Sequence, residues 1–221
     1  MQPKILINVK KLLLVGAVAL FGAANAQTKF GVKAGYALST MNVNENDLGA
    51  LKSKSGFYVG ALVEHSLTEK FALQAELQYA NLGAKVEESE SGITVTENIN
   101  MNRILLPVSA KYFVTPNFGI YGGPFVSFKA SNKVKIKVKG TSVDAGTQDE
   151  INEYEKMLED YINGGLKSSE FGLFFGAEVK VYKGLFADAR YSFGLSNQIK
   201  DPVDGEKSKL NFFQVGLGYK F

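Results

Sequence analysis

Apolar side chains alternate with small or polar side chains along most of the chain after Phe30. A period of two predicts β-strands, because successive side chains of a strand point to opposite faces. Eight segments show this alternation, and each has one apolar face. The third is the clearest, with an apolar face of Phe71, Leu73, Ala75, Leu77 and Tyr79. An apolar run of the roughly 20 residues that a membrane helix needs does not occur, so a membrane crossing would have to use strands.

The connections between these segments alternate between short and long. Three are tight, at 68–70, 115–117 and 182–184, and we expect hairpin loops that place Asn117 and Gly184 in the left-handed conformation. Four are long and polar, at roughly 39–54, 80–99, 129–169 and 196–209. Short turns at one end and long loops at the other are typical of a transmembrane barrel with periplasmic turns and extracellular loops.

The composition of the two faces indicates which of them lies inside. The polar face is rich in glycine, where a solvated strand would carry Thr, Lys and Glu, and glycine suits a cramped lumen. The apolar face ends in aromatic residues, as membrane interfaces favour. Each backbone amide left unpaired at a strand edge costs several kcal/mol of free energy in lipid, so the sheet must close. The sequence therefore predicts an all-β fold, an eight-stranded antiparallel up-and-down transmembrane β-barrel.

Two prolines interrupt this pattern. Pro107 and Pro124 lie inside the fourth and fifth segments. Proline cannot donate to a sheet ladder, so we expect bulges or strand ends near both.

Charged residues of the polar face would lie in a lumen just wide enough for side chains to fill. Buried charges must pair, and the hairpin at 182–184 places Glu178 diagonal to Arg190 and Lys180 diagonal to Asp188. A packed structural plug is the favoured interpretation, and a narrow solute or ion channel gated by this network is the alternative. The network comprises Lys33, Glu64, Glu76, Arg103, Lys111, Glu178, Lys180, Asp188, Arg190 and Lys220.

The first 26 residues have the pattern of a secretory signal peptide. Three lysines precede an apolar stretch at 12–21, and Ala24-Asn25-Ala26 forms a small-x-small cleavage site. The predicted units are a signal peptide, 1–26, and a barrel domain, 27–221. Without the three lysines the net charge of +3 falls to zero, so we expect no nucleic-acid partner.

Residue chemistry argues against metal binding and catalysis. The chain has no cysteine and one histidine, His65, so thiolate and imidazole metal sites have no ligands. An enzyme would need a nucleophile and a base at the extracellular rim, whereas His65 adjoins a predicted periplasmic turn. Glu64 and Glu76 would face a packed lumen without an evident substrate pocket. We therefore expect no catalytic residue, metal or cofactor.

The longest predicted loop, 129–169, contains two patterned segments. Thr147 and Glu150 form a capping box, and apolar residues at helical spacing follow until Gly164. The acidic face of this helix could bind a cation or a partner, although such faces are more often simply solvated. Before the helix, four lysines alternate with apolar residues, as in a strand that continues above the membrane. They could contact lipopolysaccharide phosphates or pair with the acidic helix, and they are Lys133, Lys135, Lys137 and Lys139.

Three stretches resemble the PorT-like outer-membrane β-barrel family. They are 104–128 (ILLPVSAKYFVTPNFGIYGGPFVSF), 171–197 (FGLFFGAEVKVYKGLFADARYSFGLSN) and the C-terminal FFQVGLGYKF. The likeness covers almost all of 27–221 and includes both internal prolines, whereas the loop at 129–169 is longer than expected for the family. The terminal aromatics, Tyr219 and Phe221, look like the signal that barrel-assembly machinery recognises.

The resemblance implies a location and a fold but no chemistry. We expect an integral protein of a Gram-negative outer membrane, in contact with outer-membrane lipid and lipopolysaccharide. It would act as a structural or interaction protein, with its extracellular loops displayed to a protein partner.

Overall fold

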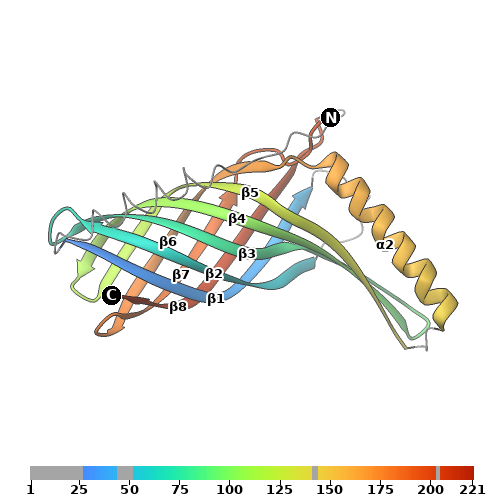
Figure 1. The fold of residues 1–221 in the computed structure, drawn as a ribbon, viewed down its shortest axis with the longest axis horizontal. Helices are drawn as coiled ribbons and strands as arrows, with labels where there is room; N and C mark the ends of the chain where they lie inside the picture. The colour runs from blue at the N-terminus through green and yellow to red at the C-terminus, as the bar shows by residue number, and fades with distance from the viewer. Residues whose placement is uncertain (1–26, 44–51, 141–143, 203–204) are drawn as a thin grey trace, which may run out of the picture.

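A computed structural model describes residues 27–43, 52–140, 144–202 and 205–221 of the chain. Each strand pairs antiparallel with its neighbours in sequence, and β1 also pairs with β8, so the sheet is a closed barrel (Figure 1). This confirms the eight-stranded up-and-down barrel. The predicted signal peptide, 1–26, lies outside the described residues. The described residues contain the strands and helix β1 (Thr28–Val43), β2 (Lys52–Ser66), β3 (Phe71–Glu90), β4 (Ile93–Thr115), β5 (Phe118–Lys139), α2 (Ala145–Gly165), β6 (Ser169–Tyr182), β7 (Leu185–Gly194) and β8 (Ser208–Lys220).

The predicted apolar face of every strand lies on the outside of the barrel. On β3, Phe71, Leu73 and Leu77 are exposed, whereas Gln74 and Glu76 are buried. The apolar stretch of β3 matches the roughly 9–11 residues with which a tilted strand crosses a bilayer. Among the part of the chain that the structure describes, no helix is long and apolar enough to span a membrane.

A polar belt ends this apolar surface on the side of the long connections. Asn81 Nδ2 donates to Asn102 Oδ1 over 2.7 Å, and Asn102 Nδ2 donates to Ser131 Oγ over 2.9 Å. These residues share the outer face with Tyr79 and Ile104, which are exposed apolar residues two positions away on β3 and β4. The belt therefore marks the edge of the apolar surface.

Three strands continue well beyond this belt. β3, β4 and β5 have 20, 23 and 22 residues, and their ends form a three-stranded sheet, which we call the blade (residues 82–101 and 132–140). Figure 1 shows the blade extending past the other strands, with α2 beside it. The expected loop at 80–99 is therefore wrong, because its residues form a continuous hairpin that turns at Ser91 and Gly92, both at positive φ. The strand that carries the four lysines is confirmed.

The helix is confirmed, but its start differs from the prediction. Asp144, and not Thr147, is the N-cap residue, and its Oδ1 accepts the backbone N–H of Thr147 over 2.8 Å. Asp is a cap residue as good as Thr, so two capping signals three residues apart competed.

The tight turns are confirmed at their three positions, but their conformations differ from the prediction. Neither Asn117 nor Gly184 is among the described residues with positive φ, and Lys183 takes that conformation instead, at φ 48°. Gly184 is required for a different reason: a Cβ there would lie 2.1 Å from the carbonyl oxygen of Lys220 on β8. Thr68 and Thr115 close the other two turns by accepting the backbone N–H three residues ahead.

Both strands continue through their prolines, so the expected bulges or strand ends near them are wrong. The β3–β4 pairs are interrupted around Pro107 and the β4–β5 pairs around Pro124, and the register is the same on either side. Each proline thus removes a donor from one ladder without shifting it.

Candidate functional site

Buried charges fill the half of the lumen nearest the tight turns. Lys111 lies at the centre of the first group, with its Nζ 2.6 Å from Glu64 and 2.7 Å from Glu178. Lys220 reaches the same two carboxylates at 2.8 and 2.5 Å. We call these four residues the lower charge cluster. Its two cations and two anions balance, and buried charges require that balance.

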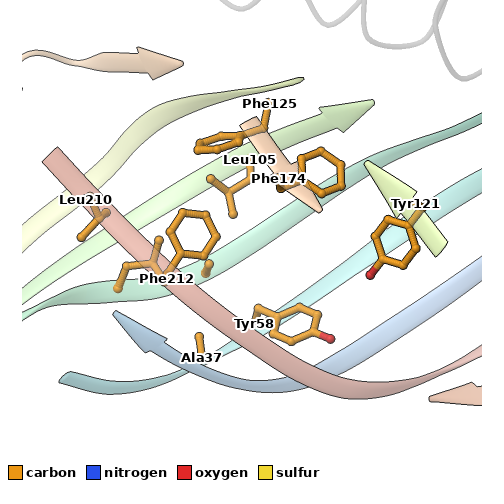
Figure 2. Packing of buried hydrophobic residues seen from close by; sticks show 10 residues of the cluster. Ala37, Tyr58, Leu105, Tyr121, Phe125, Phe174, Leu210 and Phe212 are labelled. Carbon is orange, nitrogen blue, oxygen red and sulfur yellow. The ribbon is translucent and has the colours of Figure 1, made fainter. Parts of the chain in front are cut away.

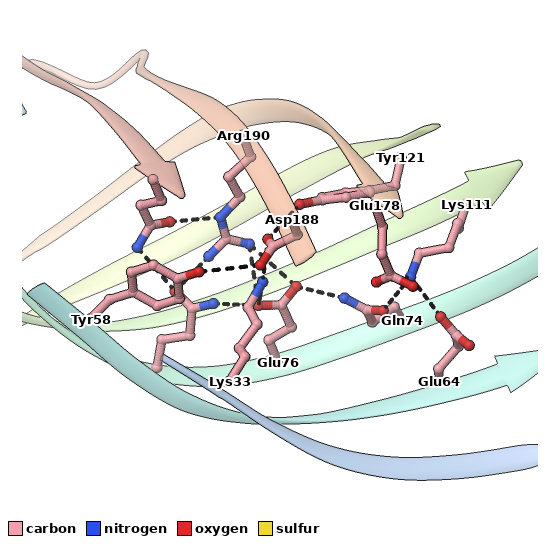
Figure 3. Close-up of polar contacts among 12 residues, drawn as sticks. Lys33, Tyr58, Glu64, Gln74, Glu76, Lys111, Tyr121, Glu178, Asp188 and Arg190 are labelled. Atoms are coloured by element: carbon pink, nitrogen blue, oxygen red, sulfur yellow. Dashed lines mark hydrogen bonds and ion pairs between the residues drawn. The ribbon is translucent and has the colours of Figure 1, made fainter. Parts of the chain in front are cut away.

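A second group lies deeper in the lumen and is also balanced. Lys33 Nζ lies 2.9 Å from Asp188 and 3.1 Å from Glu76, and Arg190 donates to both oxygens of Glu76 at 3.2 Å. These four residues form the central charge cluster, and Gln74 hydrogen bonds to both clusters (Figure 3).

Neutral side chains complete the central charge cluster. The hydroxyls of Tyr58 and Tyr121 donate to the two oxygens of Asp188, at 3.2 and 2.8 Å. Arg190 also donates to Gln78 and Gln214, at 2.5 and 2.6 Å. Sequence reasoning did not include these tyrosines and glutamines in the network. The alternation of the strands could have identified them, because all of them occupy the polar face that points into the lumen.

Eight of the ten predicted lumen residues are buried and Lys220 is partly buried, but the two predicted ion pairs are wrong. Glu178 pairs with Lys111 and Lys220 instead of Arg190, and Asp188 pairs with Lys33 instead of Lys180. These pairs cross the lumen between strands that are not successive, which hairpin register does not reveal. The side chain of Lys180 is exposed at the end of β6.

An apolar layer closes the lumen above the charge clusters. It consists of Leu105, Phe125, Phe174, Leu210 and Phe212, each at most 5% exposed (Figure 2). Phe174 stacks on Arg190, with 5.1 Å between the ring centroid and Cζ, so the layer lies directly against the central charge cluster. Glycine makes room for the rings: a Cβ at Gly172 would lie 2.5 Å from Phe125. The glycine-rich face is therefore a packing surface.

One ion pair lies on the far side of this layer. Arg103 is 1% exposed, and its Nη2 lies 3.1 Å from Glu170. Glu170 also accepts a hydrogen bond of 2.7 Å from Gln198 Nε2. Arg103 is thus buried as predicted but is separate from the two charge clusters.

The opposite end of the lumen opens into a cavity of about 840 Å³, among whose lining residues are Lys29, Lys180 and Phe186. Glu64, Glu178 and Lys220 also line it, so the cavity ends at the lower charge cluster. His65 lies beside the neighbouring turn, and its Nδ1 hydrogen bonds to Thr28 Oγ1. No group of three or more His, Cys, Asp or Glu within the described residues is placed to hold a metal ion.

Outside the barrel, α2 covers the free edge of β5. Glu155 Oε1 accepts the backbone N–H of Ile136 over 2.7 Å, and Glu159 Oε1 accepts that of Val134 over 3.0 Å. Four residues of helix rise about 6 Å and two residues of strand about 6.6 Å, so the two spacings match. The carboxylates thereby satisfy amides that would otherwise form an open sheet edge.

Lys135 reinforces this contact, with its Nζ 2.7 Å from Glu155. Burial raises the pKa of Glu155, but the hydrogen bonds from Lys135 and Ile136 outweigh it, and the pKa lies below its usual value. Of the two uses predicted for the lysine row, pairing with the helix thus occurs at Lys135. Lys133, Lys137 and Lys139 have exposed side chains.

Comparisons with known proteins place this geometry in context. The family described as outer membrane protein beta-barrel domain matches residues 24–200. No curated protein sequence matches the chain. Neisserial surface protein A has a similar structure at 17% identity, covering 87% of this chain and 97% of that chain, with a TM-score of 0.48.

Two further solved structures are similar. For Ail, the attachment invasion locus protein of Yersinia pestis, the identity is 14%, the coverage 88% of this chain and 99% of that chain, and the TM-score 0.44. For OprG of Pseudomonas aeruginosa the values are 13%, 87%, 95% and 0.39.

Proposed function

Since this chain belongs to the outer membrane protein beta-barrel domain family and lies in the outer membrane, we propose that its barrel is a closed, non-catalytic anchor. In this proposal the anchor holds the blade and α2 outside the cell, where they meet a protein partner. We further propose a PorT-like member of the family, secreted through the signal peptide at 1–26 and inserted by barrel-assembly machinery that reads Tyr219 and Phe221. The stretches at 104–128 and 171–197 support that assignment.

The observation that carries the proposal is the apolar layer across the lumen. An ion would have to lose its hydration to pass Phe125, Phe174 and Phe212, and apolar constrictions block conduction by excluding water. Below the layer, the charges of both clusters are already paired with one another. The narrow-channel alternative requires the apolar layer to open.

The surface proposed for the partner is the outward face of α2. Tyr154, Met157 and Tyr161 recur at helical spacing there and are 45%, 57% and 79% exposed. Tyrosine and methionine are enriched at protein interfaces. The opposite side of the helix is occupied by its contact with β5.

Planar-bilayer recording of the refolded mature chain tests the closed anchor. We expect no openings from the wild type, with heat-dependent gel mobility as the control for insertion. The variant Phe174→Ala/Phe212→Ala removes two rings from the layer and is expected to conduct. The matched variant Phe175→Ala/Phe213→Ala removes two rings from the lipid-facing surface and is expected to stay silent. Reproducible wild-type openings that Glu178→Gln weakens would favour the channel instead.

A further inference from the structure

The two faces of the blade differ in chemistry. The inner face carries apolar residues with acidic ones between them, including Val86, Glu88, Val95, Glu97, Ile99 and Ile136. The outer face is polar and basic. The four lysines of β5 lie there in register with four polar residues of β4, Thr94, Thr96, Asn98 and Asn100. At the other edge of the blade, Lys52 of β2 lies in register with Lys85 of β3. The lysines of the outer face are Lys52, Lys85, Lys133, Lys135, Lys137 and Lys139.

These lysines are only partly neutralised. Glu87 pairs with Lys52 and Lys85 at 3.0 and 2.5 Å, and Glu155 pairs with Lys135. The hydrogen bonds from Lys85 and Lys52 lower the pKa of Glu87 to about 2. Lys133, Lys137 and Lys139 form no ion pair with any residue that the structure describes. The outer face thus has a surplus of positive charge concentrated on β5.

The position of the lysines suggests what this charge meets. The outer face continues the lipid-facing surface of the barrel: on β5, Val126 and Phe128 are followed by Ser131 of the polar belt and then by Lys133. Lys133 lies about 15 Å along the strand from Phe128, and Lys137 and Lys139 lie about 13 and 20 Å beyond Lys133. Because the strand is tilted, the height of each lysine above the membrane is smaller than its distance along the strand. A polar headgroup layer is roughly 5–7 Å thick, and the flexible lysine side chain can reach back toward it.

We propose that the outer face of the blade binds the phosphate groups of lipopolysaccharide in the surrounding outer leaflet, through Lys133, Lys137 and Lys139. This binding would hold the outer face of the blade at the membrane surface and leave its inner face and α2 accessible to a partner. This goes beyond the anchor function, since it depends on the membrane location and the strand register and not on whether the lumen conducts.

The test compares the full mature chain with Lys133→Gln/Lys137→Gln/Lys139→Gln, binding to vesicles of purified lipopolysaccharide. Each lysine near an anionic surface contributes about fivefold in affinity, so the triple variant is expected to bind about a hundredfold more weakly. The matched control, Lys29→Gln/Lys180→Gln/Lys183→Gln, removes three exposed lysines at the opposite end and is expected to bind like the wild type.

Two further measurements test whether the phosphate groups of lipopolysaccharide are responsible for the binding. Dephosphorylated lipopolysaccharide is expected to bind the wild type as weakly as intact lipopolysaccharide binds the triple variant. Wild-type affinity is expected to fall steeply with salt, and free inorganic phosphate to compete only at millimolar concentrations. Equal binding of the wild type and the triple variant, or no dependence on phosphorylation or salt, would overturn the proposal. Conductance of the wild type would overturn the closed anchor alone.

Discussion

Lys111 is the residue on which the lower charge cluster depends. It is fully buried and lies within 2.7 Å of two carboxylates, Glu64 and Glu178. Charges removed from water are tolerated when they are paired, and breaking such a pair leaves an uncompensated charge in a site of low dielectric constant. Lys220 alone cannot neutralise both carboxylates.

Replacing Lys111 with methionine should therefore be costly. Lys111→Met is expected to lower the free energy of unfolding by about 3–5 kcal/mol, measured by urea denaturation of the refolded protein in micelles. Lys180→Met is the matched control, because Lys180 also follows the polar face but is exposed, and its expected effect is within about 0.5 kcal/mol. Similar losses from both substitutions would show that burial does not determine the cost.

The strand period indicated which residues enter the lumen, but not their partners. Alternation alone placed Lys111, Glu178 and Arg190 inside, since a strand has two faces. The contact of Lys33 with Asp188 joins β1 to β7 across the lumen, so it depends on the tilt and stagger of the closed barrel. The prediction that Lys180 lies in the lumen is wrong, because alternation does not show where along the strand the lumen ends.

At the scale of elements, the contact between α2 and β5 depends on two glutamates. Glu155 and Glu159 are one helical turn apart and accept alternate amides of the strand edge. Because the pKa of Glu155 is lowered in the folded state, this contact stabilises the protein above the usual glutamate pKa of about 4.3. That contribution is lost as the pH falls through the depressed folded value.

Hydrogen exchange at the amides of Val134 and Ile136 reports on this contact. We expect protection at pH 7 and at pH 5, and loss of protection as the pH falls below the usual pKa of a glutamate. Glu155→Gln/Glu159→Gln should reduce protection at neutral pH, because an amide is a weaker acceptor than a carboxylate. Glu153→Gln, at an exposed position of the same helix, serves as control. Unchanged protection in the double variant would mean that other contacts hold α2.

The sequence indicated the strands of the lipid-facing barrel better than those of the blade. In the lipid-facing barrel, each strand has the packed lumen on one side and lipid on the other, which enforces a regular period of two. The segment at 80–99 is long and polar, which is typical of a loop, and its asparagines and glutamates are depleted in strands. Its pairing across Ser89 and Thr94, whose hydroxyls lie 2.9 Å apart, became apparent only in the folded chain.

At the scale of the whole molecule, the anchor and the display surface lie at opposite ends of the chain's fold. All three tight turns lie at one end of the barrel, and the blade and α2 extend from the other (Figure 1). The charge clusters and the apolar layer fill the space between them. In the proposed function, the barrel holds the blade and α2 on the outside of the cell.

The chain has no cysteine, so a single introduced cysteine can report its own location. Ser91→Cys lies at the tip of the blade and Asn117→Cys in the turn between β4 and β5. In intact cells treated with a membrane-impermeant maleimide, we expect labelling of Ser91→Cys alone, and labelling of Asn117→Cys only after the outer membrane is permeabilised. Labelling of Asn117→Cys in intact cells, with Ser91→Cys protected, would show that the tight turns and not the blade face the outside of the cell.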